Sequence, residues 1–184
     1  MIKSIINIIN VIYSRLLSFS FKTSNRVFVH FPASITGNKN ISFGKNCFLG
    51  KNCIISAWEQ HRKQKFSPSI QVGNNCDFGE FNHISAINKI QIGDGLLTGR
   101  WVTITDNAHG NNDKKEQNIR PIERIVYSKG PVIIGNNVWI GDKATILPGV
   151  TIGDSATIGA NTVVTHDVPA NSTAVGNPMR IIKR

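Results

Sequence analysis

His109 is the residue of this chain best suited to acid-base chemistry. It is the only histidine in the segment VTITDNAHGNNDKK, which begins at Val102. An imidazole titrates near neutral pH, so it can remove a proton from a hydroxyl nucleophile and later give that proton to a leaving group. A histidine in a surface loop is by default only solvated, so this assignment depends on the elements that hold the loop.

A six-residue period follows this segment and runs from Ile134 to Val175 as IGNNVW-IGDKAT-ILPGVT-IGDSAT-IGANTV-VTHDVP-ANSTAV. Helices need apolar residues at a spacing of three or four and strands at two, so this period predicts a short strand plus a turn, repeated. The first and fifth positions are expected to point inward, and glycine at the second suits a tight bend. Weaker copies begin at Phe43, Val72 and Ile92. Such units bury their apolar face only by stacking, so the sequence predicts a solenoid.

The cysteines fit this core better than a reactive or metal site. Cys47, Cys53 and Cys76 all fall on the inward fifth position of a hexad, and their spacing offers no partners for a disulfide, zinc or nucleophilic role. A length of 184 residues suits one such domain. We expect it to span residues 22–184, with loop excursions at residues 57–69 and 110–131.

This pattern resembles the hexapeptide-repeat acyltransferase superfamily over roughly residues 35 to 182. The resemblance implies an all-β fold, a left-handed parallel β-helix in which three hexads make one triangular coil. Galactoside and maltose O-acetyltransferases, and more closely the O-acetyltransferases of capsule and O-antigen synthesis, carry a histidine seven residues after an inward valine, as Val102 and His109 do here. The run from Pro131 to Ile182 is similar to the family's signature region without a gap.

The resemblance implies an acetyl-CoA-dependent O-acetyltransferase acting on a sugar or surface-polysaccharide precursor, with no metal. His109 is then the general base for direct transfer without an acyl-enzyme, and a backbone N–H stabilises the oxyanion. Asp106, Asn107 or a backbone carbonyl could orient it. The family forms homotrimers with the active site between two subunits, so His109 of one chain is expected to meet Trp139 of another.

The coenzyme contacts follow from the ungapped run. Two positions depart from the family: Asp142 stands where relatives often have serine, and His166 replaces a common lysine near the phosphates, which weakens that charge contact at neutral pH. The contacts implied by the resemblance are Trp139, Asp142, Ala160, Thr165, His166 and Arg180.

The acceptor side departs further from galactoside relatives. Their sugar-binding asparagine and aspartate fall on Gly79 and Ile87 here, so those polar contacts are lost. The acceptor is therefore not expected to be a simple galactoside. Nearby polar residues that offer a different set, or that are ordinary solvated turn residues, are Glu80, Asn82, His83 and Asn88.

The formal charge of +10 is concentrated outside the repeats. Solvated loops are one interpretation, and a phosphate-rich partner such as a coenzyme is the other. Nucleic acid is not expected, since no motif that reads RNA or DNA accompanies the charge. The basic side chains occupy the two excursions and the C-terminus, as His61, Arg62, Lys63, Lys65, Lys114, Lys115, Arg120, Arg124, Lys129, Arg180, Lys183 and Arg184.

Residues 1–21 are predicted to form an amphipathic helix, because apolar residues recur there at three-and-four spacing. Asn7, Asn10 and Arg15 make it a poor membrane span. We expect it to pack on the first coil or a neighbouring subunit and cover an open β-edge. The alternative is shallow membrane attachment, which would suit a lipid-linked substrate.

Three other functions stay open. One is acetylation of an amine, as in amino-sugar or serine acetyltransferases, although the long helical domain of the latter is missing. Another is a metalloenzyme resembling γ-class carbonic anhydrases, disfavoured because the next histidine after His109 is His166. The last is a non-catalytic scaffold. Buried cysteines and the lack of a cleavable signal favour the cytoplasm, at its inner membrane face if residues 1–21 bind lipid.

Overall fold

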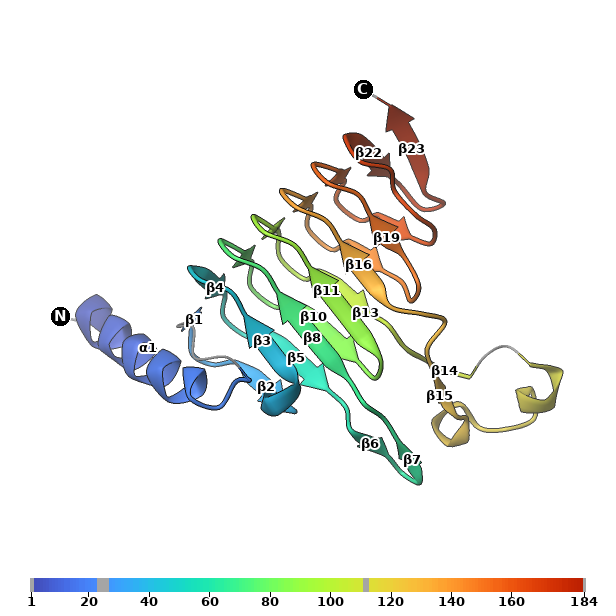
Figure 1. The fold of residues 1–184 in the computed structure, drawn as a ribbon, viewed down its shortest axis with the longest axis horizontal. Helices are drawn as coiled ribbons and strands as arrows, with labels where there is room; N and C mark the ends of the chain where they lie inside the picture. The colour runs from blue at the N-terminus through green and yellow to red at the C-terminus, as the bar shows by residue number, and fades with distance from the viewer. Residues whose placement is uncertain (1, 23–26, 111–112, 184) are drawn as a thin grey trace.

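The chain is a left-handed parallel β-helix with one α-helix at its N-terminal end, as the computed structural model shows (Figure 1). The structure describes residues 2–22, 27–110 and 113–183, so the predicted basic residue Arg184 lies outside the described part. Three sheets form the walls of a triangular prism, here called walls A, B and C.

Wall A contains eight strands, all parallel except that β23 runs antiparallel to β22. In spatial order they are β1 (Val27–Val29), β4 (Cys47–Leu49), β9 (Asp77–Phe78), β12 (Leu97–Thr98), β17 (Trp139–Ile140), β20 (Thr157–Ile158), β22 (Ser172–Val175) and β23 (Arg180–Lys183). Wall B contains β2 (Ser34–Thr36), β5 (Ile54–Ala57), β10 (His83–Ala86), β13 (Thr103–Thr105), β18 (Thr145–Ile146) and β21 (Val163–Val164). Wall C contains β3 (Ile41–Phe43), β8 (Ser69–Val72), β11 (Lys89–Ile92), β16 (Val132–Ile134) and β19 (Thr151–Ile152).

The polar residues of each hexad form the corners of the prism. Asn137 and Asn161 adopt φ values of 54° and 57°, a left-handed conformation that asparagine tolerates better than most residues. One residue before this left-handed position, a side-chain oxygen of one coil accepts a hydrogen bond from a backbone N–H of the neighbouring coil. Asp154 Oδ1 accepts the Asn136 N–H at 2.7 Å, and Asn136 Oδ1 accepts the Asp94 N–H at 2.9 Å. The corners are therefore fixed by side-chain ladders as well as by strand pairing.

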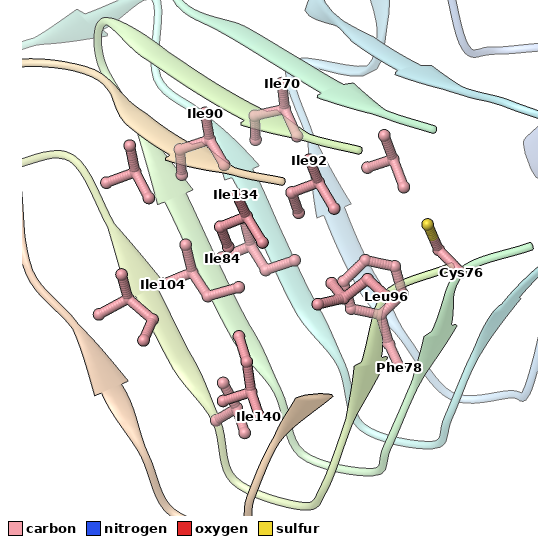
Figure 2. Packing of buried hydrophobic residues seen from close by; sticks show 14 of the residues in the cluster. Ile70, Cys76, Phe78, Ile84, Ile90, Ile92, Leu96, Ile104, Ile134 and Ile140 are labelled. Carbon is pink, nitrogen blue, oxygen red and sulfur yellow. The ribbon is translucent and has the colours of Figure 1, made fainter. Parts of the chain in front are cut away.

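The inward positions predicted from the period form one continuous core. Equivalent residues stack on adjacent coils, as Ile70 does on Ile90, and Ile92 on Ile134 (Figure 2). Each buried aliphatic side chain of this kind contributes about 1.5–3 kcal/mol to the stability. The prediction for the cysteines is confirmed, since the three are buried and unbridged.

The N-terminal helix α1 (Ile2–Ser18) packs on β1, the end strand of wall A, so the predicted cover over an open edge is confirmed. It does so through Asn10, Ser14 and Ser18, which are buried, and through the partly buried Tyr13 and Leu17, while most of its large apolar side chains are exposed. No helix in the described part of the chain is long and apolar enough to cross a membrane.

Both excursions leave the prism at the corner between walls B and C, hereafter corner BC (Figure 1). The first carries the hairpin β6 (Gln60–His61) and β7 (Gln64–Lys65). The second carries the antiparallel pair β14 (Ala108–His109) and β15 (Val126–Tyr127), with the short helices η2 (Lys114–Glu116) and η3 (Pro121–Glu123) between them. A further short helix, η1 (Asn38–Asn40), precedes β3.

Candidate functional site

His109 is held on β14, a short strand that continues from wall B out of the prism. β14 pairs with β15 so that His109 stands opposite Val126, and the Gly110 N–H donates to the Ile125 carbonyl at 2.7 Å. Val102, at the base of the segment, is buried in the core. The imidazole is exposed. The loop histidine is therefore fixed by backbone pairing on a rigid scaffold, which suits a residue that must meet a substrate.

The two excursions meet at His109. The Gln64 side chain accepts the Val126 N–H at 2.8 Å and donates to the Val126 carbonyl at 3.1 Å, so it ties the first hairpin to β15. The His61 ring lies edge-on to the His109 ring, with centroids 5.4 Å apart, and stacks on Trp58 at 5.7 Å. His61 Nε2 is buried without a hydrogen-bond partner among the described residues. Trp58 and Gln64 carry no signal in the sequence that marks them as functional, and His61 stands out there only as part of a basic cluster.

Asp106 supports the corner that lies between the two excursions. Its carboxylate is fully buried and accepts the N–H groups of Ile87 and Asn88, each at 2.9 Å. Asn107 donates its side-chain amide to the Ser85 carbonyl at 3.1 Å and to Asp106 Oδ1 at 3.1 Å. Both residues proposed to orient His109 thus bond to wall B and corner BC. No hydrogen bond from either to His109 appears among the described contacts.

A cleft of about 400 Å³ opens beside His109 at corner BC. Residues on both sides of the histidine in sequence line it, and so does Thr165, one of the predicted coenzyme contacts. The lining is Ala108, Gly110, Tyr127, Lys129, Leu147, Pro148 and Thr165. A substrate in this cleft would lie against the segment that carries the candidate base.

A second cavity, of about 440 Å³, lies between the two excursions. It is rich in cationic groups, and its one acid, Glu123, forms an ion pair with Arg120. That neighbour lowers the pKa of the Glu123 carboxyl. The lining is His61, Arg62, Lys63, Gln64, Glu123, Arg124 and Ile125. The cavity would suit an anionic group more than a neutral one.

The predicted coenzyme residues divide between separate parts of one chain. Trp139 is exposed on wall A, and Asp142 and Ala160 follow at the corner between walls A and B. Thr165 and His166 lie at corner BC, where their side chains contact each other at 3.1 Å. In a triangular prism corner BC lies opposite wall A, so one chain does not bring these groups together.

Two further predicted coenzyme contacts, Asp142 and Arg180, lie at the corner between walls A and B and on wall A, respectively. Asp142 Oδ1 accepts the Arg100 N–H at 2.8 Å, so the aspartate that replaces the family's serine acts as a corner cap. Arg180 is exposed on β23, where it pairs with Val175.

Of the predicted acceptor residues, only Asn88 lies at corner BC, where it is exposed between the excursions. Asn82 is buried and cannot meet a substrate, because its amide bonds Thr98 and the Val102 N–H. That expectation is corrected: Asn82 is a structural residue. Glu80 lies at the corner between walls A and B, 3.7 Å from Arg100. His83 is on wall B, where partial burial lowers the pKa of its imidazole.

Comparison with known proteins identifies the family. Two family models match: "bacterial transferase hexapeptide (six repeats)" over residues 131–166, and "hexapeptide repeat of succinyl-transferase" over residues 40–79. A relative in Escherichia coli (strain K12), named as lipopolysaccharide biosynthesis O-acetyl transferase WbbJ, is 32% identical over 180 residues, which are 96% of this chain and 87% of the relative. The chain belongs to the hexapeptide-repeat acetyltransferase family.

Solved structures of similar proteins agree with this assignment. A maltose O-acetyltransferase from Clostridium difficile 630 is 32% identical with a TM-score of 0.60, over 92% of this chain and 72% of that one. A galactoside acetyltransferase in complex with coenzyme A is 28% identical with a TM-score of 0.57, over 92% of this chain and 68% of that one. The expected left-handed β-helix is confirmed, and this hexapeptide-repeat protein is an acyltransferase.

Proposed function

We propose that this protein transfers the acetyl group of acetyl-CoA to a hydroxyl of a sugar or of a surface-polysaccharide precursor. The observation that carries the proposal is that one cleft is lined by Thr165 and by Ala108 and Gly110, the residues on either side of His109. The segment that carries the base and a coenzyme contact inferred from family resemblance thus border one space. Relatives named as O-acetyltransferases support the hydroxyl as nucleophile.

His109 supplies the proton transfer that this reaction needs. A sugar hydroxyl keeps its proton far above neutral pH, so it becomes a useful nucleophile only as a base removes that proton. The hydroxyl oxygen attacks the thioester carbonyl while the His109 imidazole takes the proton. The tetrahedral intermediate then collapses, the carbon–sulfur bond breaks, and the imidazolium returns its proton to the departing thiolate of CoA. A backbone N–H of a coil stabilises the oxyanion.

The coenzyme site is completed by a second chain. Thr165 and His166 of one chain lie near its own His109, whereas Trp139 lies on the opposite side of the prism. A cyclic trimer would bring wall A of one subunit to corner BC of the next, and every interface would then be the same heterologous contact. Coenzyme A would bind in that seam, with Trp139 of one chain beside the arm and Arg180 near a phosphate.

The cationic cavity between the excursions favours an acceptor that carries phosphate. Arg62, Lys63 and Arg124 border it, and it reaches His61, whose ring touches His109. A nucleotide-linked or lipid-linked sugar would place its diphosphate there and its hydroxyl near the base. Such acceptors are intracellular intermediates, which agrees with a cytoplasmic location.

Release of free thiol from acetyl-CoA, measured against a panel of acceptors, tests the proposal. We expect turnover with nucleotide-linked or lipid-linked sugars, and mass spectrometry should show one acetyl ester that mild base removes. An acetyl amide formed only on amino sugars would assign the protein to N-acetylation. The absence of turnover with every acceptor, in a protein that binds CoA, would leave the scaffold role in its place.

A further inference from the structure

The helix α1 buries three polar side chains, beside the partly buried Tyr13 and Leu17, while most of its aliphatic side chains are exposed. Asn10 Oδ1 accepts the Phe31 N–H at 2.9 Å, Ser14 Oγ accepts the Val29 N–H at 2.8 Å, and Ser18 Oγ accepts the Val27 N–H at 3.2 Å. Four helical residues rise about 6 Å and two strand residues about 6.6 Å, so successive contacts stay in register. This polar ladder satisfies two N–H groups of β1, the end strand of wall A, and that of Phe31 just after it.

The opposite side of α1 is an exposed apolar stripe. Leu16 is 68% exposed and Phe19, just after the helix, is 89% exposed. The stripe follows helical spacing, so its members face one direction. They are Ile5, Ile8, Ile9, Ile12, Leu16 and Phe19. A continuous exposed apolar surface of this size marks an interaction site.

The charge of this end of the molecule indicates what the stripe contacts. The first acidic residue of the chain is Glu59, and the Lys39 ammonium lies 2.9 Å from its carboxylate. All charged residues before it are basic, namely Lys3, Arg15, Lys22, Arg26, Lys39, Lys45 and Lys51. An exposed apolar stripe on a chain segment that carries only basic charges is complementary to anionic lipid. Two copies of this end would instead repel each other.

We propose that the α1 stripe docks the protein on the surface of an anionic lipid bilayer. The helix lies in the plane of the interface with Ile12, Leu16 and Phe19 among the acyl chains, and Arg15 at the headgroups. The polar ladder to β1 stays intact, so docking needs no rearrangement. Packing on the β-helix and binding a membrane are therefore compatible roles for opposite sides of one helix.

Flotation with lipid vesicles tests this inference without any assay of activity. The full chain is mixed with vesicles of phosphatidylcholine and phosphatidylglycerol, or of phosphatidylcholine alone, and the protein in the floating layer is measured. We expect flotation with the anionic vesicles only. The double variant Ile12→Glu and Leu16→Glu, whose changes point away from β1, should reduce the floating fraction about tenfold or more.

A matched variant separates the stripe from general surface hydrophobicity. Ile122→Glu removes an equally exposed isoleucine of the second excursion and should float like the parent protein. Failure of the parent to float with anionic vesicles would overturn the proposal, and so would unchanged flotation of the double variant. A parent assembly that fails to float, and that falls to a smaller mass in the double variant by light scattering, would show that the stripe binds another protein chain.

Discussion

Replacement of Asp106 by alanine should be among the most destabilising changes in the chain. The carboxylate is fully buried and accepts two N–H groups at 2.9 Å, from Ile87 and Asn88. Hydrogen bonds to a charged group contribute about 1.5–3 kcal/mol each, and their loss leaves the N–H of the buried Ile87 without this partner. We therefore expect the free energy of unfolding to fall by about 3–5 kcal/mol. Asp106→Asn keeps one acceptor and should cost about half as much.

Asp154 provides a matched control for the effect of burial. Asp154 caps the backbone of Asn136 at 2.7 Å in the same way, but it is exposed. Asp154→Ala should cost only about 1 kcal/mol, since water replaces the lost acceptor. Urea unfolding at a fixed protein concentration, followed by tryptophan fluorescence, measures all three variants. Equal losses for Asp106→Ala and Asp154→Ala would refute the argument that burial of the corner decides the cost.

Further predictions concern the coenzyme seam and the helix. Trp139→Ala should raise the KM for acetyl-CoA roughly tenfold with little change in kcat; an unchanged KM would exclude Trp139 from the seam. His166→Lys restores a full charge near the phosphates and should lower that KM about threefold, an effect that high salt removes. Ser14→Ala leaves the buried Val29 N–H unpaired, which should cost about 1–3 kcal/mol in urea unfolding, whereas the exposed Ser20→Ala should be nearly neutral.

The β-helix could be predicted from the sequence because each six-residue unit corresponds to one strand and one turn of the prism. Positions such as Ile134 and Ile140 repeat because each occupies the same place on successive walls of the prism, and both are buried. The orientation of α1 did not follow from the sequence. In the sequence Asn10 interrupts an apolar stripe. In the fold its side chain accepts the N–H of Phe31, just after β1. Such a role is visible only once the unpaired edge is known.

The site was predictable only in part, for a similar reason. Family resemblance selected His109, and both excursions follow a strand of wall B, so their common corner could have been counted from the period. The contact between His61 and His109 depends on the hairpin that Gln64 bonds to Val126. The hairpin lies outside the six-residue period, so its position could not be predicted from that period. Asn82 illustrates the opposite error, because a turn asparagine can be a buried support as easily as a ligand-binding group.

The most direct test of the proposed mechanism is the rate of CoA release by His109→Ala. With an accepted sugar substrate, loss of the general base should reduce kcat by about 10²–10⁴. The oligomeric mass and the binding of acetyl-CoA should remain unchanged, because His109 is exposed and lies outside the core. His30→Ala, a change in the first coil far from the cleft, should keep full activity. A His109→Ala protein that turns over at the parent rate would contradict the assignment of this histidine as the base.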